Sequence, residues 1–129
     1  LEKVHVGSAA IDLAHATLPT STLWHPAVGR VLSRAEVEAF IADYLGRVGP
    51  ARAEALRPWL APMRRLTWLR TTLFMARWRV QTRAARDAAD PGQWSDAGLD
   101  PAMKAHIDAC IDRCFSADMV QSVRADRDA

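Results

Sequence analysis

The absence of one residue type and the scarcity of two others limit the kinds of site that this chain can form. It contains no asparagine, only two lysines and only six scattered glycines among 129 residues. A phosphate-binding loop needs closely spaced glycines, and the H-x-D-x-x-x-x-N loop that serves catalysis and magnesium binding needs an asparagine. Neither motif is present. We therefore expect no nucleotide or magnesium site within this chain, and we assign it no catalytic residue.

The sequence also lacks long apolar runs and has few cysteines. Its uncharged apolar stretches fall well short of the ~20 residues that a membrane-spanning helix requires. Cys110 and Cys114 are the only cysteines, and a spacing of four within a helical segment directs their side chains poorly for a disulfide. Reduced thiols fit a reducing compartment. We therefore expect a soluble, cytoplasmic protein with no membrane partner.

The charges that are present divide the chain. Residues 30–86 contain twelve arginines against four acidic side chains, whereas residues 87–129 contain nine aspartates against four basic ones. This division is consistent with a nucleic-acid surface, or with two halves of one domain that pack with complementary charge. Because the arginines lie within a strongly apolar helix rather than in a separate basic arm, we expect no nucleic-acid partner.

Helix signals follow one another along most of the chain, which predicts an all-α fold. Ser8 is a candidate cap for a helix over residues 9–18 that Pro19 ends, and residues 20–30 read as a loop. Ser33 and Glu36 form a capping box for the next helix, which carries one apolar stripe. The stripe consists of Val37, Phe40, Ile41, Tyr44, Leu45 and Val48.

Prolines and glycines predict the other helix ends. Gly49-Pro50 ends one helix and starts another, while Pro58 and Pro62 interrupt the pattern twice. Asp90-Pro91-Gly92 closes the helix that follows, Asp100-Pro101 opens the next, and a short helix over residues 117–123 comes last. Residues 1–6 alternate, with Val4 and Val6 on one side, and can finish a strand. We expect one helical (sub)domain over residues 1–129.

A long central helix dominates the prediction. From Met63, about 25 residues run without proline or glycine. One apolar face is expected to be buried, and further large side chains extend it so far round that we expect burial on several sides. The face consists of Leu66, Leu69, Leu73, Ala76 and Val80, and the extension of Trp68, Phe74, Met75 and Trp78.

One cluster superficially resembles a metal site. His106, Cys110 and Cys114 are four residues apart and share a helical face. Zinc needs three or four ligands, and a single helix offers two at this spacing. Free cysteines also behave as small apolar residues. We therefore expect two buried thiols and a partly buried histidine, with no metal bound.

Several short motifs resemble the aminoglycoside phosphotransferase and choline kinase-like family, which has a protein-kinase-like fold. In that family the metal-binding Asp is followed by a Glu, a Gly and an Asp-Leu-Ala triplet, which Glu2, Gly7 and the triplet beginning at Asp12 match. Later in that family, a capped helix ending in a Tyr-Leu pair precedes a long tryptophan-rich helix. Here Tyr44-Leu45 and residues 66–79 occupy those places. The departure is Ser8-Ala9, where relatives often have Asp-Pro.

This resemblance implies a helical C-terminal subdomain of an ATP- and magnesium-dependent small-molecule phosphotransferase, inactive alone. The metal-binding Asp would lie just before residue 1, and the missing N-terminal kinase portion would be a partner. Asp12 would support the catalytic loop from beneath, or it simply caps an early helical turn. Arg65 and Trp68 would line the acceptor site. Because the surrounding segment is basic, a neutral or anionic hydroxylated acceptor fits better than a polycationic one.

One further expectation accompanies this interpretation. Apolar side chains near the start of the chain, at Val4, Val6 and Ile11, would be exposed without the missing portion, so the chain is expected to self-associate or to pair with it. The alternative is a self-contained helical ligand-binding or protein-interaction domain with no catalysis.

Overall fold

The computed structural model describes residues 7–87 and 98–125, with side chains omitted over 83–87, and these residues form helices and no strand. The all-α prediction is confirmed for this part of the chain. The predicted strand at Val4 and Val6, and the turn at Asp90-Pro91-Gly92, lie outside the described residues. The helices are α1 (Ala9–Thr17), α2 (Pro19–Thr22), α3 (Arg34–Arg47), α4 (Pro50–Asp87), α5 (Pro101–Cys114) and α6 (Ala117–Ala125).

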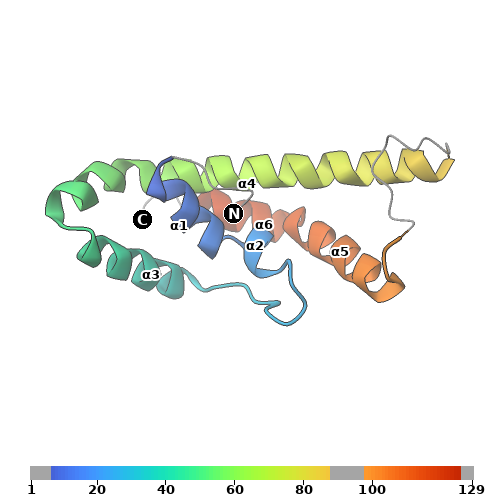
Figure 1. Cartoon of the computed structure of the whole chain (residues 1–129), viewed down its shortest axis with the longest axis horizontal. Coiled ribbons are helices and arrows are strands. Elements are labelled where there is room, and N and C mark those ends of the chain that lie inside the picture. Colours follow the sequence, from blue (N-terminus) through green and yellow to red (C-terminus); the bar gives the residue numbers. More distant parts are fainter. Residues whose placement is uncertain (1–6, 88–97, 126–129) are drawn as a thin grey trace.

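Helix α4 is the scaffold of the fold. It forms one long edge of the molecule in Figure 1, and α1 packs along it more extensively than any other helix does. Helices α2, α5 and α6 pack against the same scaffold, and α5 also packs against α2 and α6, while α3 folds back beside the N-terminal turns of α4. No helix in the described ranges is long and apolar enough to cross a lipid bilayer.

The predicted helix caps are confirmed by their hydrogen bonds. The hydroxyl oxygen of Ser8 accepts from the amide of Ala10 at 3.3 Å, which satisfies a free donor at the start of α1. At the start of α3 the Ser33 hydroxyl accepts from the Glu36 amide, and the Glu36 carboxylate accepts from the Ser33 amide at 2.8 Å. The sequence signals therefore place the starts of these helices correctly.

The turn between α3 and α4 depends on one glycine. Gly49 has φ +83°, in the left-handed region that side chains disfavour, and Pro50 occupies the first turn of α4, where its missing amide hydrogen is not needed. Likewise, Asp100 caps α5 by accepting from the Ala102 amide at 2.8 Å. Both predicted junctions are confirmed.

Three prolines behave differently from the prediction. Pro58 and Pro62 lie inside α4, which continues without interruption from Pro50 to Asp87. Each proline removes one backbone hydrogen bond and crowds the preceding turn, and the first turns of α4 curve toward α3 before the helix straightens (Figure 1). Pro19 ends α1 but also begins the short helix α2, so the predicted loop starts only at Leu23.

The core consists of three small clusters rather than one large one. Helices α4 and α5 share the first, α1, α4 and α6 share the second, and the residue after α2 joins α5 and α6 in the third. The clusters comprise Met75, Ile107, Ile111 and Cys114 with Trp78; Ala14, Leu18 and Val123 with Trp68; and Leu23, Cys110 and Met119.

The prediction for the long helix was wrong about which face is buried. The inward face of α4 carries Thr67, Thr72 and Thr82, each at most 8% exposed, whereas the predicted core face is largely exposed. Threonine is tolerated inside because its hydroxyl can donate to the preceding turn, as in Thr72 to the Trp68 carbonyl at 3.0 Å. The exposed apolar side chains are Leu66, Leu69, Leu73, Phe74 and Val80.

Two smaller predictions of burial were also only partly right. On α3, Val37 and Leu45 are buried, but Phe40 is 46% exposed. On α5, Met103 is 39% exposed although Ile107 and Ile111 on the same predicted stripe are buried.

Candidate binding pocket between two helices

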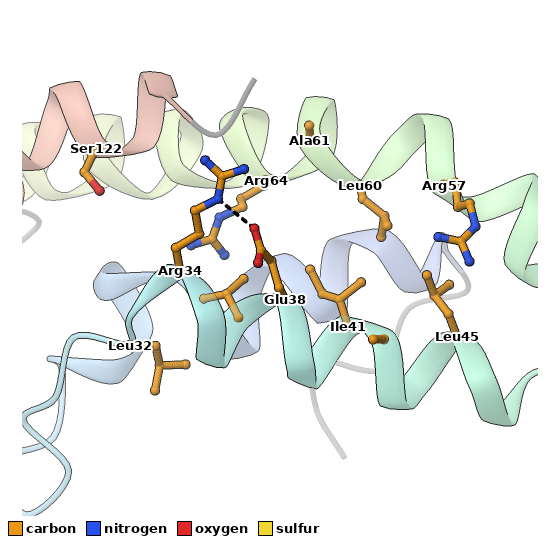
Figure 2. Close-up of a pocket in the computed structure, with 12 residues that line it drawn as sticks. Leu32, Arg34, Glu38, Ile41, Leu45, Arg57, Leu60, Ala61, Arg64 and Ser122 are labelled. Carbon is orange, nitrogen blue, oxygen red and sulfur yellow. Dashed lines mark hydrogen bonds and ion pairs between the residues drawn. The ribbon is translucent and has the colours of Figure 1, made fainter. Parts of the chain in front are cut away.

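A pocket of about 450 Å³ lies between α3 and α4, within the range of small-molecule sites. Figure 2 shows the two helices facing each other across it, with aliphatic side chains from both in the middle. Ser122 of α6 lies at one end. The lining residues are Leu32, Arg34, Val37, Glu38, Ile41, Ala42, Leu45, Arg57, Leu60, Ala61, Arg64 and Ser122.

The local sequence explains why this pocket exists. On α3, Val37, Ile41 and Leu45 recur every four residues and therefore share the face toward α4. On α4, Arg57, Leu60, Ala61 and Arg64 form the corresponding face at spacings of three and four. The curvature of α4 over these turns brings its face over α3 without closing the space between the helices.

Arginines mark both ends of the pocket. At one end, the Nε of Arg34 lies 2.6 Å from Oε1 of Glu38, and Arg64 enters from the opposite helix (Figure 2). Arg64 also donates to the hydroxyl and to the carbonyl oxygen of Thr17, which ties α4 to the end of α1. Three arginines against one glutamate leave the lining with an excess of positive charge.

Arg57 at the other end differs from its neighbours. Among the residues that the structure describes, it has no hydrogen-bond or ion-pair partner, and its side chain points toward Leu45 in Figure 2. A cation beside an apolar surface, without a carboxylate to neutralise it, favours an anionic ligand group. The pocket is therefore suited to a ligand with an apolar body and a negative or strongly polar end.

A second cavity, of about 460 Å³, has a different character. It lies where α4 and α5 diverge, and it is lined by aromatic and aliphatic side chains with no charged group in its lining. Such a cavity can hold an apolar group but offers nothing to orient a polar one. Its lining comprises Trp24, Phe74, Met75, Trp78, Leu99, Ile107 and Ile111.

The three site residues predicted from the sequence, Asp12, Arg65 and Trp68, do not line either cavity. Asp12 is exposed in the first turn of α1, with no partner in the described part of the chain. Trp68 packs against Ala14, Leu18 and Val123, and its indole Nε1 is buried without a hydrogen-bond partner. Arg65 is half-buried, and its Nε likewise has no partner.

The cysteine and histidine cluster is built into the packing of α5. Cys110 and Cys114 are buried free thiols, as predicted. The Sγ of Cys110 donates to the Leu23 carbonyl at 3.0 Å, and Nε2 of His106 lies 3.1 Å from the Trp24 carbonyl oxygen. Within 7–87 and 98–125, no group of three or more His, Cys, Asp or Glu side chains could hold a metal ion.

Burial also sets the protonation of these thiols. Burial raises the pKa of Cys114 to about 11, and the neighbouring Cys110 contributes in the same direction. Burial likewise raises the pKa of Cys110, although the nearby Arg113 opposes this. Both groups are neutral thiols at physiological pH, and neither is activated as a nucleophile.

Sequence reasoning missed the pocket arginines. Arg57 and Arg64 are seven residues apart, which places them on one face of a continuous helix. This spacing is visible in the sequence, but the helix interruptions predicted at Pro58 and Pro62 place the two arginines in different segments.

Comparisons with protein-family models, with curated proteins and with solved structures find no match to this chain.

Proposed function

We propose that this chain is a substrate-binding helical unit whose ligand occupies the pocket between α3 and α4. The observation that carries this proposal is an apolar pocket of about 450 Å³ with Arg57 at its edge, where that cation has no partner among the described residues. The aliphatic walls would hold the ligand body, and Arg57 would pair with an anionic or polar group. The small size of the pocket favours a metabolite-sized ligand over a polymer.

In the intact protein, we propose that this unit forms the C-terminal acceptor-binding part of an ATP-dependent small-molecule phosphotransferase. The support is the sequence resemblance at Glu2, Gly7 and Asp12, together with a capped helix that carries Tyr44-Leu45 near its end and precedes a long tryptophan-rich helix. The basic pocket agrees with a neutral or anionic acceptor. Asp12 in the first turn of α1 is exposed, as a residue that supports another segment would be.

The described residues do not fit ATP and magnesium. Phosphoryl transfer requires a lysine on the phosphates, a catalytic Asp, and an Asp and an Asn for magnesium. The chain has no asparagine, and the carboxylates of the described residues do not gather into a metal-binding group. In the proposed phosphotransferase, the nucleotide would therefore bind to a kinase portion outside this chain. The second candidate, a self-contained helical ligand-binding domain, shares the same pocket and needs no such portion.

Ligand binding can be tested with two probes of equal chain length. Calorimetry with decanoate and with decyltrimethylammonium compares an anionic and a cationic head on one apolar body. We expect decanoate to bind more tightly, and Arg57→Ala to weaken it about fivefold to tenfold, near 1 kcal/mol. Arg52→Ala, an exposed arginine of α4 outside the pocket, is the matched control. Equal affinity for both probes, or no effect of Arg57→Ala, would refute the pocket assignment.

A separate experiment tests the phosphotransferase assignment. Titration of the isolated chain with Mg-ATP should give no saturable heat, whereas the protein extended upstream of Leu1 should bind ATP. An Asp directly before Leu1, and an H-x-D-x-x-x-x-N motif roughly fifteen to twenty residues earlier, would support the kinase. A micromolar dissociation constant for ATP on the isolated chain, or the absence of both motifs upstream, would refute the phosphotransferase assignment and favour the self-contained domain.

A further inference from the structure

The outward face of α4 has the pattern of a helix–helix interface. Leu66, Leu69, Leu73, Ala76 and Val80 follow one another at alternating spacings of three and four, which is the a/d repeat of a coiled coil over two heptads. We call these five residues the α4 seam. The opposite side of α4 contributes to the apolar core of the fold.

Four of the five seam residues are exposed, and Ala76 is partly buried. Leu69 is 48% exposed and Val80 is 67% exposed, with Leu66 and Leu73 between these values. Buried threonines take the inward positions on the same helix, so the fold does not use these leucines for its own core. A contiguous exposed apolar stripe of this kind marks an interaction site.

The positions that flank the seam are almost all arginine. With Leu66 at an a position, the e positions of the two heptads are Arg70 and Arg77, and the g positions are Arg65, Thr72 and Arg79, of which Thr72 is buried. No acidic residue lies on α4 between Glu54 and Asp87. Arg79 turns toward Asp112 of α5, but Arg70 is exposed and has no partner within the described ranges. Charges at e and g select the partner of a coiled coil.

These flanks disfavour a second copy of the chain as the occupant. In a parallel pair, e positions face g positions, and in an antiparallel pair e faces e and g faces g. Both arrangements place arginine against arginine along the seam, and like charges across an interface are unfavourable. A partner helix with Asp or Glu at the facing positions would instead pair with Arg70.

We infer that the α4 seam binds an acidic amphipathic helix, in which apolar side chains recur at a/d spacing and carboxylates occupy the flanks. The seam spans fourteen helical steps, about 21 Å, so a helix of about four turns covers it. The inference is independent of the proposed ligand pocket. Leu66 is nine residues from Arg57, which is two and a half turns, so the seam and the pocket lie on opposite sides of α4.

Two synthetic 21-residue peptides provide the probe. Both have leucine at every a and d position, but one has glutamate at e and g and the other has lysine. Fluorescence anisotropy with the full chain should show the glutamate peptide binding at least tenfold more tightly than the lysine peptide, with weaker binding at high salt. Equal binding of the two peptides, or no binding of the glutamate peptide, would overturn the inference.

Single substitutions locate the binding surface. Leu73→Gln should weaken binding of the glutamate peptide at least fivefold, and Val28→Gln, which changes an exposed apolar residue in a loop away from α4, should not. Arg70→Glu should lower affinity for the glutamate peptide and raise affinity for the lysine peptide. Circular dichroism checks folding, and Leu66→Gln replaces Leu73→Gln if the latter is unfolded. A dimer in sedimentation that Leu73→Gln dissociates would assign the seam to a second copy and overturn the acidic partner.

Discussion

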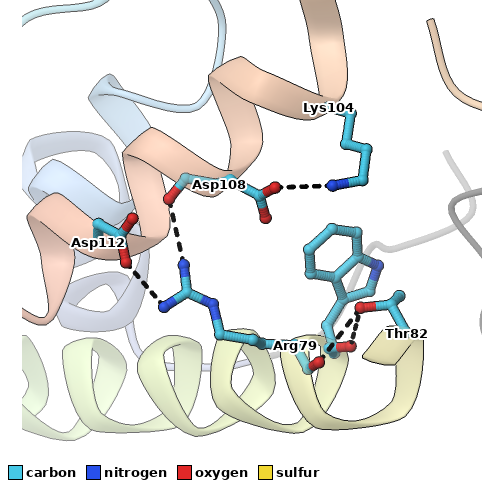
Figure 3. Close-up of polar contacts among 6 residues, drawn as sticks. Arg79, Thr82, Lys104, Asp108 and Asp112 are labelled. Carbon is cyan, nitrogen blue, oxygen red and sulfur yellow. Dashed lines mark hydrogen bonds and ion pairs between the residues drawn. The ribbon is translucent and has the colours of Figure 1, made fainter. Parts of the chain in front are cut away.

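The guanidinium group of Arg79 on α4 and the carboxylate of Asp112 on α5 form an ion pair, with Nη1 and Oδ1 2.8 Å apart. The other terminal nitrogen of Arg79 donates to the Asp108 carbonyl oxygen at 3.2 Å, and Lys104 pairs with the Asp108 carboxylate (Figure 3). The basic middle and acidic C-terminal part of the sequence therefore meet within one fold. This contact agrees with the prediction of complementary packing.

Removing this link should cost more stability than removing a surface pair. Arg79 is only 23% exposed, and it joins two helices through two hydrogen bonds. We expect Arg79→Ala to lower the free energy of unfolding by about 1–2 kcal/mol. Arg47→Ala, which removes a fully exposed pair with Asp43 within α3, should leave it nearly unchanged. Urea denaturation measures both, and equal effects would contradict the linking role.

Substitutions at Trp68 and Trp59 test whether Trp68, the candidate acceptor-site residue, belongs to the core instead. Trp68 packs among Ala14, Leu18 and Val123, whereas Trp59 on the same helix is 55% exposed. Trp68→Ala should therefore destabilise the fold by about 3 kcal/mol and Trp59→Ala by less than about 1 kcal/mol. Thermal denaturation followed by circular dichroism gives the comparison. In the intact protein, a reduced specificity constant for the acceptor with an unchanged melting temperature would return Trp68 to the substrate site.

The buried thiol of Cys114 should make stability depend on alkaline pH. Its folded-state pKa of about 11 lies above the usual value of 9.0, so the folded state holds the proton more tightly than the unfolded state does. This contribution is fully present below about pH 9 and is lost as the pH rises toward 11. Cys114→Ala should flatten the fall in stability over this range. A parallel fall in both proteins would show that other groups cause it.

The prolines inside α4 should lower the stability of that helix. Pro62 is exposed, and its ring leaves the carbonyl of Pro58 without the usual helical donor. We expect Pro62→Ala to raise stability by about 1–3 kcal/mol. Pro50→Ala is the control, because a first-turn proline removes no helical hydrogen bond, and its effect should be within about 0.5 kcal/mol. A loss of stability in Pro62→Ala would mean that the packing of α4 depends on its curvature.

Helix ends could be predicted from the sequence because their causes are local. Ser33 and Glu36 satisfy each other's backbone amides within one turn, and Gly49 supplies a backbone angle that few other residues adopt. These signals need no knowledge of distant residues. The long central helix was also correctly expected from residue 63 onward.

The buried face of that helix could not be predicted in the same way. Helix α4 carries large apolar side chains on several of its sides, so the hydrophobic pattern alone does not determine which side faces the core. The orientation depends on what α1 offers, and α1 presents the small residues Ala10 and Ala14. Such residues allow close approach to the threonine side of α4. The pocket was missed for a related reason, since Arg57 and Arg64 share a face only if Pro58 and Pro62 do not interrupt the helix.

The attachment of α3 has a consequence for how a ligand would be measured. This helix buries only Val37 and Leu45 and packs chiefly on one stretch of α4, so it should open locally at a lower free energy than α1 or α5. Its amide hydrogens would then exchange with solvent deuterium before those of the three core clusters. A ligand between α3 and α4 binds only the closed form and would slow this exchange selectively. Exchange of the α3 amides would therefore report occupancy of the pocket for ligands that have no signal of their own.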